Sequence, residues 1–269
     1  MKLTFIAPSS MLKVLDEYQD FYLLLAHIAK EDKKYRDFFI KSNKYKVMDN
    51  SAHELRVPFD WQETIDLSEE LKCQEIVLPD HPYNAYRTLQ DSEKALKKLK
   101  GHKFRVMAVL QGSNLKEYNE CLATMSSWEQ VNVLGLSFRV AAKCFAEVTG
   151  DKEVMQNRIT AIGDLVSRFG TQPPYNKEIH LLGLGDVYEL GSYVGLPWIR
   201  GCDTTKQVRY GLKGIEFENG HCPDKVEGRL DFSVSEYSAR TMKIITSNIR
   251  ETKRVAEGKY RSQVGQVSV

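Results

Sequence analysis

The chain has 269 residues, of which 42% are hydrophobic and 28% are charged, and its formal net charge at pH 7 is +2. These ordinary values exclude a disordered chain and a protein built mainly of membrane-spanning segments. With so little net charge, a polyanionic partner would have to meet local clusters of Lys and Arg. No apolar run approaches the roughly 18 residues of a spanning helix, and the strand-like N-terminus is too short for a signal peptide, so we expect a cytoplasmic protein.

Short apolar runs recur along the chain and predict strands that are buried on both faces. The runs lie at 3–8, 46–51, 75–82, 105–113, 132–137, 178–186, 198–205 and 214–218. Helical spacing predicts helices at 61–72, 84–100, 114–128 and 152–170, and a long terminal helix at 233–258. Ser113 or Asn114 fits an N-cap and Gly170 a C-cap. The alternation predicts a TIM-type (β/α)8 barrel in one domain over residues 1–269, because such barrels have roughly 250 residues.

Three of the predicted strands end in an aspartate: Asp49, Asp80 and Asp203. The carboxyl ends of barrel strands open into one mouth, where the chemistry of such barrels takes place. A carboxylate there can act as a nucleophile, a base or a hydrogen-bond acceptor. Each aspartate alone could instead cap a helix or form a loop ion pair. The three together favour a functional site.

Other strand ends suit a flat polar ligand. Gln111, followed by Gly112, ends a strand with an amide that both donates and accepts, and Gly135 would let the backbone approach a ligand closely. The alternative for Gly135 is tight strand packing. His180, within a buried run, is interpreted as a core histidine. Gly183 lies in a turn that could hold a phosphate, but no GxGxxG motif supports a dinucleotide site.

Metal-ligand patterns are missing from the sequence. The five cysteines are scattered without a CxxC pair, and the histidines lack the paired spacing of zinc or iron sites. We therefore expect reduced thiols, no disulfide framework, no cofactor and no structural zinc.

The motifs VMDNSAHEL, IVLPDHPYN, VMAVLQGS, NVLGLS and HLLGLGDVYELGSYVGLPWIRGCDTT, in this order, resemble the tRNA-guanine transglycosylase family. They are most similar to its short phage members, which put 7-deazaguanine bases into DNA. The similarity covers roughly residues 45–214, and its most specific part pairs HLLGLGD with an aspartate about twenty residues later. It implies exchange of guanine in DNA for 7-cyano-7-deazaguanine (preQ0) or a related base, in the cytoplasm of an infected bacterium.

The resemblance also implies residue roles. Asp203 aligns with the nucleophile that forms a covalent aspartyl-glycosyl intermediate, Asp80 with the acid that recognises the base, and Asp49 with an acid for proton transfer or base contact. Gln111 and Gly135 align with positions that contact the edge of the purine. From the chemistry alone, either Asp49 or Asp80 could move the proton between the two bases. The family's paired glycines read Leu134-Gly135 here, so one backbone contact to the base differs.

A duplex substrate would require base flipping, because the barrel mouth cannot reach a stacked nucleotide. Tyr83 or Tyr86 could stack on the flipped purine, and the alternative is ordinary packing. Lys206 and Arg209, one turn past Asp203, could bind flanking phosphates, and the alternative is a solvated helix face.

The sequence also departs from the family pattern. The tRNA enzymes carry a CxCxxC zinc site with a later histidine, where this chain offers only His221 and Cys222. This difference favours DNA over tRNA as the substrate. The alternative functions are the same reaction on tRNA and a non-catalytic relative that binds nucleic acid or a protein subunit. A homodimer is compatible with the basic terminal helix.

Overall fold

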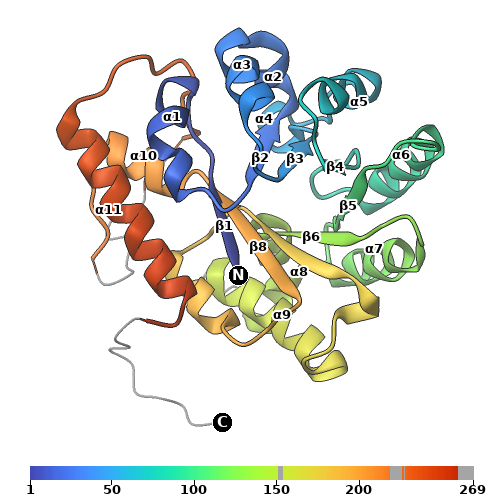
Figure 1. The fold of residues 1–269 in the computed structure, drawn as a ribbon. Helices are drawn as coiled ribbons and strands as arrows, with labels where there is room; N and C mark the ends of the chain where they lie inside the picture. Colours follow the sequence, from blue (N-terminus) through green and yellow to red (C-terminus); the bar gives the residue numbers. More distant parts are fainter. Residues whose placement is uncertain (151–153, 219–225, 227, 260–269) are drawn as a thin grey trace.

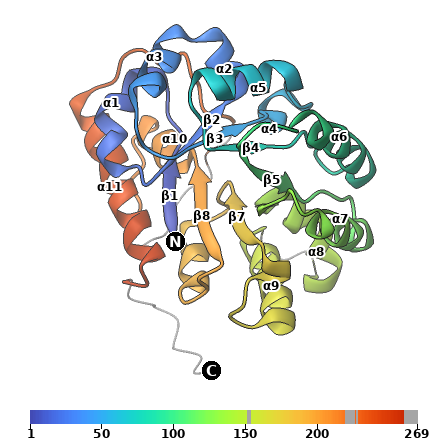
Figure 2. The same cartoon turned by 45° about the vertical axis from the view of Figure 1, so that its right-hand side comes forward.

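The computed structural model describes residues 1–150, 154–218, 226 and 228–259, and it confirms the predicted α/β barrel. Eight parallel strands are hydrogen-bonded in the order β1-β8-β7-β6-β5-β4-β3-β2 and form a nearly closed TIM-type (β/α)8 barrel (Figures 1 and 2). The strands are β1 Lys2–Phe5, β2 Tyr22–Leu25, β3 Lys46–Asp49, β4 Glu75–Val77, β5 Arg105–Val109, β6 Val133–Ser137, β7 Glu178–Leu182 and β8 Ile199–Thr204. All neighbouring pairs are parallel, so every carboxyl end opens at the same mouth.

Helices connect the strands and surround the barrel (Figure 1). The α-helices are α1 Leu12–Leu15, α2 Ala26–Glu31, α3 Lys33–Lys41, α4 Ala52–Leu55, α5 Trp61–Glu70, α6 Ala85–Lys98, α7 Leu115–Ser127, α8 Phe138–Thr149, α9 Val154–Phe169, α10 Lys206–Leu212 and α11 Ala239–Ala256. Short 3₁₀ helices lie at η1 Ser9–Met11, η2 Asp16–Tyr18, η3 Pro174–Asn176 and η4 Val187–Tyr193, and η4 takes the place of an α-helix between β7 and β8.

The cap predictions hold. Asn114 is the N-cap of α7, where its side chain accepts a hydrogen bond from the N–H of Glu117. Gly170 follows α9 with a φ of +59°, the left-handed conformation that glycine adopts at helix ends. Helix α8 was not predicted from the sequence, and the first residues of the helix predicted at 152–170 lie outside the described residues.

The predicted strand at 214–218 is wrong, and the eighth strand is β2 instead. The short run Tyr22–Leu25 is buried along its whole length and pairs with β3. In the late segment, the side chain of Asn248 on α11 accepts from the N–H of Phe217 at 2.7 Å and donates to the carbonyl of Ile215 at 3.0 Å. The amide of Asn248 thus satisfies backbone groups that a neighbouring strand would otherwise have to pair.

The sheet order leaves β1 and β2 at its two ends, and side chains bridge this seam. Gln19 is almost fully buried, its Oε1 accepts from the N–H of Phe5 at 2.7 Å, and its Nε2 donates to the carbonyl of Phe5 at 2.9 Å. Asp20 accepts from the N–H of Leu3 at 2.8 Å and donates its own N–H to the carbonyl of Leu3 at 3.0 Å. The side-chain amide of Gln19, with the carboxylate and backbone N–H of Asp20, therefore makes the hydrogen bonds that a paired strand would otherwise make to β1.

The terminal helix is shorter than the predicted 233–258. Helix α11 begins after Ser238, whose hydroxyl accepts from the N–H of Thr241, and ends at Ala256. It packs on α10 (Figure 1), where an added Cβ at Gly211 would lie 2.3 Å from the side chain of Ile245. Only glycine permits this close approach of the two helices.

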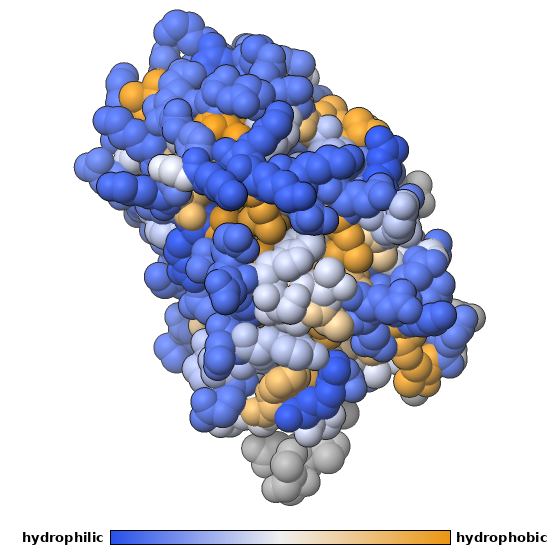
Figure 3. All heavy atoms as spheres, turned by 90° about the vertical axis from the view of Figure 1, so that its right-hand side faces the viewer, coloured by the Kyte–Doolittle hydropathy of each residue, from blue (hydrophilic) through white to orange (hydrophobic). Residues whose placement is uncertain are grey.

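The outer surface is mostly polar on the face that Figure 3 presents, where hydrophobic residues show only in small groups. Amphipathic helices that cover a barrel turn their polar sides to water in this way. Among the helices of the described residues, none is both long and apolar enough to cross a membrane.

Candidate active site

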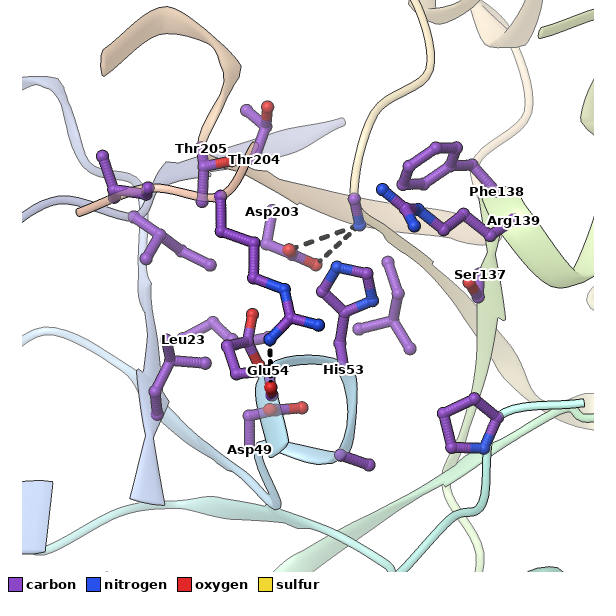
Figure 4. A pocket seen from close by; sticks show the side chains of 18 of the residues that line it. Leu23, Asp49, His53, Glu54, Ser137, Phe138, Arg139, Asp203, Thr204 and Thr205 are labelled. Atoms are coloured by element: carbon purple, nitrogen blue, oxygen red, sulfur yellow. Dashed lines mark hydrogen bonds between the residues drawn. The ribbon is translucent and has the colours of Figure 1, made fainter. Parts of the chain in front are cut away.

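A cavity of about 360 Å³ opens at the carboxyl ends of the strands. Its walls come from the ends of the strands and the loops that follow them, as expected for the active-site face of a β/α barrel. Eight of the predicted site residues line it: Asp49, Asp80, Tyr83, Gln111, Gly183, Asp203, Lys206 and Arg209. Figure 4 shows Asp203, Glu54 and Asp49 near one another, with Phe138 and Arg139 to one side.

Asp203, on β8, is held from the neighbouring strand β7. Its Oδ1 lies 3.1 Å from Nε2 of His180, and both carboxylate oxygens lie 3.3 Å from the N–H of Gly183. The carboxylate is only 7% exposed but reaches the cavity. These contacts fix its direction, so that it faces the cavity in one orientation.

His180 is a core residue, as interpreted from the sequence, but it also contacts the site. It is fully buried, with its ring edge-to-face against Phe21. Burial lowers the pKa of His180, so the ring is neutral near pH 7. A carboxylate accepts hydrogen bonds, so the contact with Asp203 places the single ring proton on Nε2.

The Gly183 turn rests on a buried ion pair that the sequence analysis missed. Gly183 has a φ of +68°, and its carbonyl accepts from both terminal nitrogens of Arg158 at 3.0 Å. Arg158, on α9, is fully buried and pairs with Glu189 of η4. The only sequence signal is an arginine on the apolar side of a predicted helix. This pair supports the turn that presents the N–H of Gly183 to Asp203.

Asp80 lies in a network of two amides. Its Oδ1 accepts from Nδ2 of Asn50 at 2.7 Å, and its Oδ2 accepts from Nε2 of Gln111 at 2.6 Å. The other end of the Gln111 amide accepts from the N–H of Tyr83 at 2.8 Å. Burial raises the pKa of Asp80 to about 6, although both hydrogen bonds oppose the shift. Asn50 was not predicted as a site residue, although it directly follows the predicted Asp49.

Tyr83 adopts the left-handed backbone conformation, with a φ of +66°. Such a conformation costs energy in a residue with a side chain, and it is retained where the surroundings impose it. Here the N–H of Tyr83 is fixed on Gln111, and the ammonium group of Lys143 lies 4.9 Å from the centre of the Tyr83 ring. Tyr86, the other predicted stacking residue, is 72% exposed and does not line the cavity.

Asp49 and Glu54 lie together on the β3–α4 segment. Burial raises the pKa of Asp49 well above its usual value, and the nearby Glu54, Asp80 and Asp203 add to the shift, while the N–H of Ser51 opposes it. Burial and the same acidic surroundings raise the pKa of Glu54 to about 7. Glu54 was missed because it lies one turn past the strand end, on a helix too short to show periodicity.

Basic side chains also line the cavity, and three of them, Arg56, Arg139 and Arg229, are exposed to solvent and form its rim. Five cationic side chains line the cavity in all: Arg56, Arg139, Lys206, Arg209 and Arg229. Lys206 donates to the carbonyl of Gly185, Arg209 to that of Val226 and Arg229 to that of Glu54. The two predicted phosphate contacts, Lys206 and Arg209, thus also hold loops in place. Carboxylates inside and cations around the opening match a substrate whose reacting part is neutral and whose flanks are anionic.

Three predicted base contacts, Gly112, Leu134 and Gly135, do not line the cavity. A Cβ at Gly135 would lie 2.8 Å from Leu182 and 3.3 Å from Val109, and the carbonyl of Gly135 accepts from Leu110. Since Leu182 and Val109 themselves line the cavity, they cover Gly135, which supports the alternative of tight strand packing. Leu134 is fully buried in the same strand. Gly112 lies against the backbone of Tyr118 on α7.

In the part of the chain that the structure describes, no three His, Cys, Asp or Glu side chains converge to hold a metal ion. His221 and Cys222 lie outside the described residues.

Comparison with known protein families finds no match for this chain, and comparison with curated proteins finds no significant relative. The geometry of the site and the motifs in the sequence are therefore what indicate the function of this chain.

Proposed function

We propose that this protein is a base-exchange transglycosylase that replaces guanine in DNA with 7-cyano-7-deazaguanine or a related 7-deazaguanine. The observation that carries the proposal is Asp203, a carboxylate fixed by His180 and Gly183 at a cavity that also holds Asp49, Asp80 and Glu54. One fixed carboxylate beside acids of raised pKa is what covalent glycosyl transfer requires.

In the first step, Asp203 attacks C1′ of the target nucleotide. The bond between C1′ and N9 breaks, and its electron pair leaves with guanine, which takes a proton from a neighbouring carboxyl group such as Asp49. The result is a covalent aspartyl-glycosyl intermediate. In the second step, the incoming base gives its N9 proton to the carboxylate left by the first step and attacks C1′, and the bonding pair returns to Asp203. No external oxidant, reductant or cofactor enters this balance.

Asp80 and Gln111 are suited to recognise the base. Guanine and 7-deazaguanines share an edge with an N1–H and an exocyclic amine, both of which donate hydrogen bonds. Asp80 can accept from this edge, because each carboxylate oxygen keeps a free lone pair beside its amide contact. The hydrogen bonds to Asn50 and Gln111 hold the Asp80 carboxylate in one orientation for that task.

The basic rim supports a nucleic acid as the polymer. A flipped nucleotide carries neutral base and sugar groups into the cavity and leaves its phosphates at the opening. Arg56, Arg139 and Arg229 stand at that opening. The same chemistry would serve a tRNA, so both polymers belong in the test. The setting that fits DNA exchange is the cytoplasm of a phage-infected bacterium.

The experiment is the incorporation of labelled 7-cyano-7-deazaguanine into guanine-containing duplex DNA and, in parallel, into unmodified tRNA. The wild type should label DNA, and Asp203→Asn, which keeps the shape of the side chain, should not. A covalent protein–DNA adduct should be trapped with the wild type only. Labelling of tRNA alone would assign the reaction to tRNA, and no labelling of either polymer by the folded wild type would contradict the proposal.

A further inference from the structure

Glu54 is the acid in the cavity that the preceding mechanism leaves without a task. It lies within the single turn of α4 and lines the cavity beside Asp49 and Asp203 (Figure 4). Its Oε2 is shielded from solvent and has no hydrogen-bond partner among the described residues. A buried carboxyl oxygen with no partner is costly, and such groups persist mainly where function uses them.

The other three acids have fixed contacts. Asp203 is bound to His180 and the N–H of Gly183, and Asp80 is bound to two amides. Asp49 accepts from the N–H of Ser51, a bond within its own turn that favours the ionised carboxylate. A group that must give and take a proton in each turnover needs a free oxygen, which Glu54 has.

We propose that Glu54, rather than Asp49, is the acid–base residue that carries the proton from the entering base to the leaving base. This role rests on the proposed base exchange. As C1′–N9 breaks, the Glu54 carboxyl gives its proton to guanine and becomes a carboxylate. The carboxylate then takes the N9 proton of the incoming 7-deazaguanine as that nitrogen attacks C1′. The proton returns to Glu54, so each cycle leaves the residue as it began.

The charges around Glu54 fit this cycle. Asp49 on β3, Asp80 in the loop after β4 and Asp203 on β8 all disfavour a further negative charge, whereas Arg229 favours it from the rim. Burial, with Asp203 and Asp80, raises the pKa of Glu54 to about 7, although the backbone N–H of Glu54 and Arg229 oppose the shift. An acid–base residue is most effective with a pKa near the working pH. Arg229 also donates to the carbonyl of Glu54, so it holds the end of α4 at the cavity.

The test compares Glu54→Gln, Glu54→Asp and a matched control, Glu147→Gln, on the exposed side of α8. Glu54→Gln should slow base exchange by about 100-fold or more, the usual contribution of general acid–base catalysis, while the affinity for DNA stays within about twofold. In the wild type, the rate of base exchange should fall as the pH rises through about 7, because Glu54 then loses the proton that it gives to guanine. This fall should be absent from Glu54→Gln. Glu54→Asp should keep part of the activity, and Glu147→Gln should match the wild type.

A second measurement does not depend on catalysis. In protein labelled with ¹³C at glutamate carboxyls, one resonance should titrate near neutral pH in the wild type and in Glu147→Gln, and it should be absent from Glu54→Gln. If Glu54→Gln exchanges bases at the wild-type rate and with the wild-type pH profile, the role of Glu54 is overturned but the proposed function is not. A folded wild type that exchanges no base would overturn the proposed function, and this role with it.

Discussion

At the scale of single residues, the orientation of the Asp203 carboxylate depends on His180, which the sequence predicts only as a buried core residue. His180 is buried, neutral and bound through Nε2 to Oδ1 of Asp203. In the proposed reaction this hydrogen bond would fix the direction from which the Asp203 carboxylate attacks. It would also stabilise the carboxylate that is released when the second base attacks C1′. His180 is thus a positioning residue, because it acts through Asp203.

We predict that His180→Leu slows formation of the covalent intermediate by roughly 10- to 100-fold, since a hydrogen bond to a charged group contributes about 1.5–3 kcal/mol. His180→Asn, which can keep a donor, should recover part of the rate. Single-turnover trapping of the protein–DNA adduct measures the effect, and thermal unfolding checks that both variants fold. Equal rates for the leucine variant and the wild type would show that Gly183 alone orients Asp203.

Sequence reasoning placed at the cavity those residues that lie at or just past the end of a strand, and their roles stay predictions. Asp49, Asp80, Gln111 and Asp203 were found because the end of a buried run marks the mouth of a barrel. Glu54 and Arg158 were missed because their roles arise from tertiary contacts. Apart from its place on the apolar side of a predicted helix, nothing local in the sequence shows that Arg158 is buried and paired with Glu189.

At the scale of elements, the seam between β1 and β2 decides how the barrel closes. Gln19 supplies both an acceptor and a donor to the backbone of Phe5, and its Oε1 also accepts from the hydroxyl of Thr4 at 3.1 Å. These bonds are buried, so the backbone groups of Phe5 would have no access to water if the amide were removed.

We predict that Gln19→Ala lowers the free energy of unfolding by about 2–4 kcal/mol, because it leaves a buried N–H and a buried carbonyl unpaired. Gln130→Ala, at an exposed turn position, should change it by less than about 0.5 kcal/mol. Urea denaturation followed by circular dichroism measures both. A loss below about 1 kcal/mol for Gln19→Ala would mean that water or a shift of β1 replaces the amide.

Element-level prediction failed at this seam and at the late segment for the same reason. Tyr22–Leu25 is too short to show a period, and 214–218 has strand-like residues but joins no strand of the barrel within the described ranges. In both places an amide side chain, Gln19 or Asn248, completes the backbone hydrogen bonding. Sequence patterns report which residues can form a strand, whereas pairing depends on neighbours that are distant in the chain.

At the scale of the whole molecule, charge is separated within a chain of net charge +2. Acids lie in the cavity and cations at its rim. We predict that the double variant Arg56→Gln/Arg139→Gln binds DNA more weakly and reduces the slope of log affinity against log salt by up to about 2, one for each lost phosphate contact. Lys100→Gln/Lys103→Gln, at the amino end of β5, should keep the wild-type slope, and the slopes are measured by fluorescence anisotropy. The same slope in both double variants would exclude Arg56 and Arg139 from phosphate binding.

The cluster of acids also makes the stability of the fold depend on pH. Glu54 has a pKa of about 7 in the folded protein, against an ordinary value of 4.5. Between these values the folded state keeps a proton that the unfolded state has lost. The free energy of unfolding therefore falls as the pH rises from about 4.5 to 7, and the loss is complete above that range.

Glu54→Gln removes this penalty, because an amide never ionises. We predict that the variant is as stable as the wild type near pH 4 and more stable by up to about 3 kcal/mol at pH 8, since each tenfold difference in proton affinity between the folded and unfolded states corresponds to about 1.4 kcal/mol. Urea denaturation across this pH range measures the difference, with Glu147→Gln as the control that should follow the wild type. Some pH dependence should remain, since the pKa values of Asp49 and Asp80 are also raised.

A variant that is less stable than the wild type at pH 8 would show that the Glu54 carboxylate is stabilised in the folded protein, with a pKa below neutrality. A more stable but inactive variant would mean that the acid is retained at the expense of stability, as expected of a catalytic group.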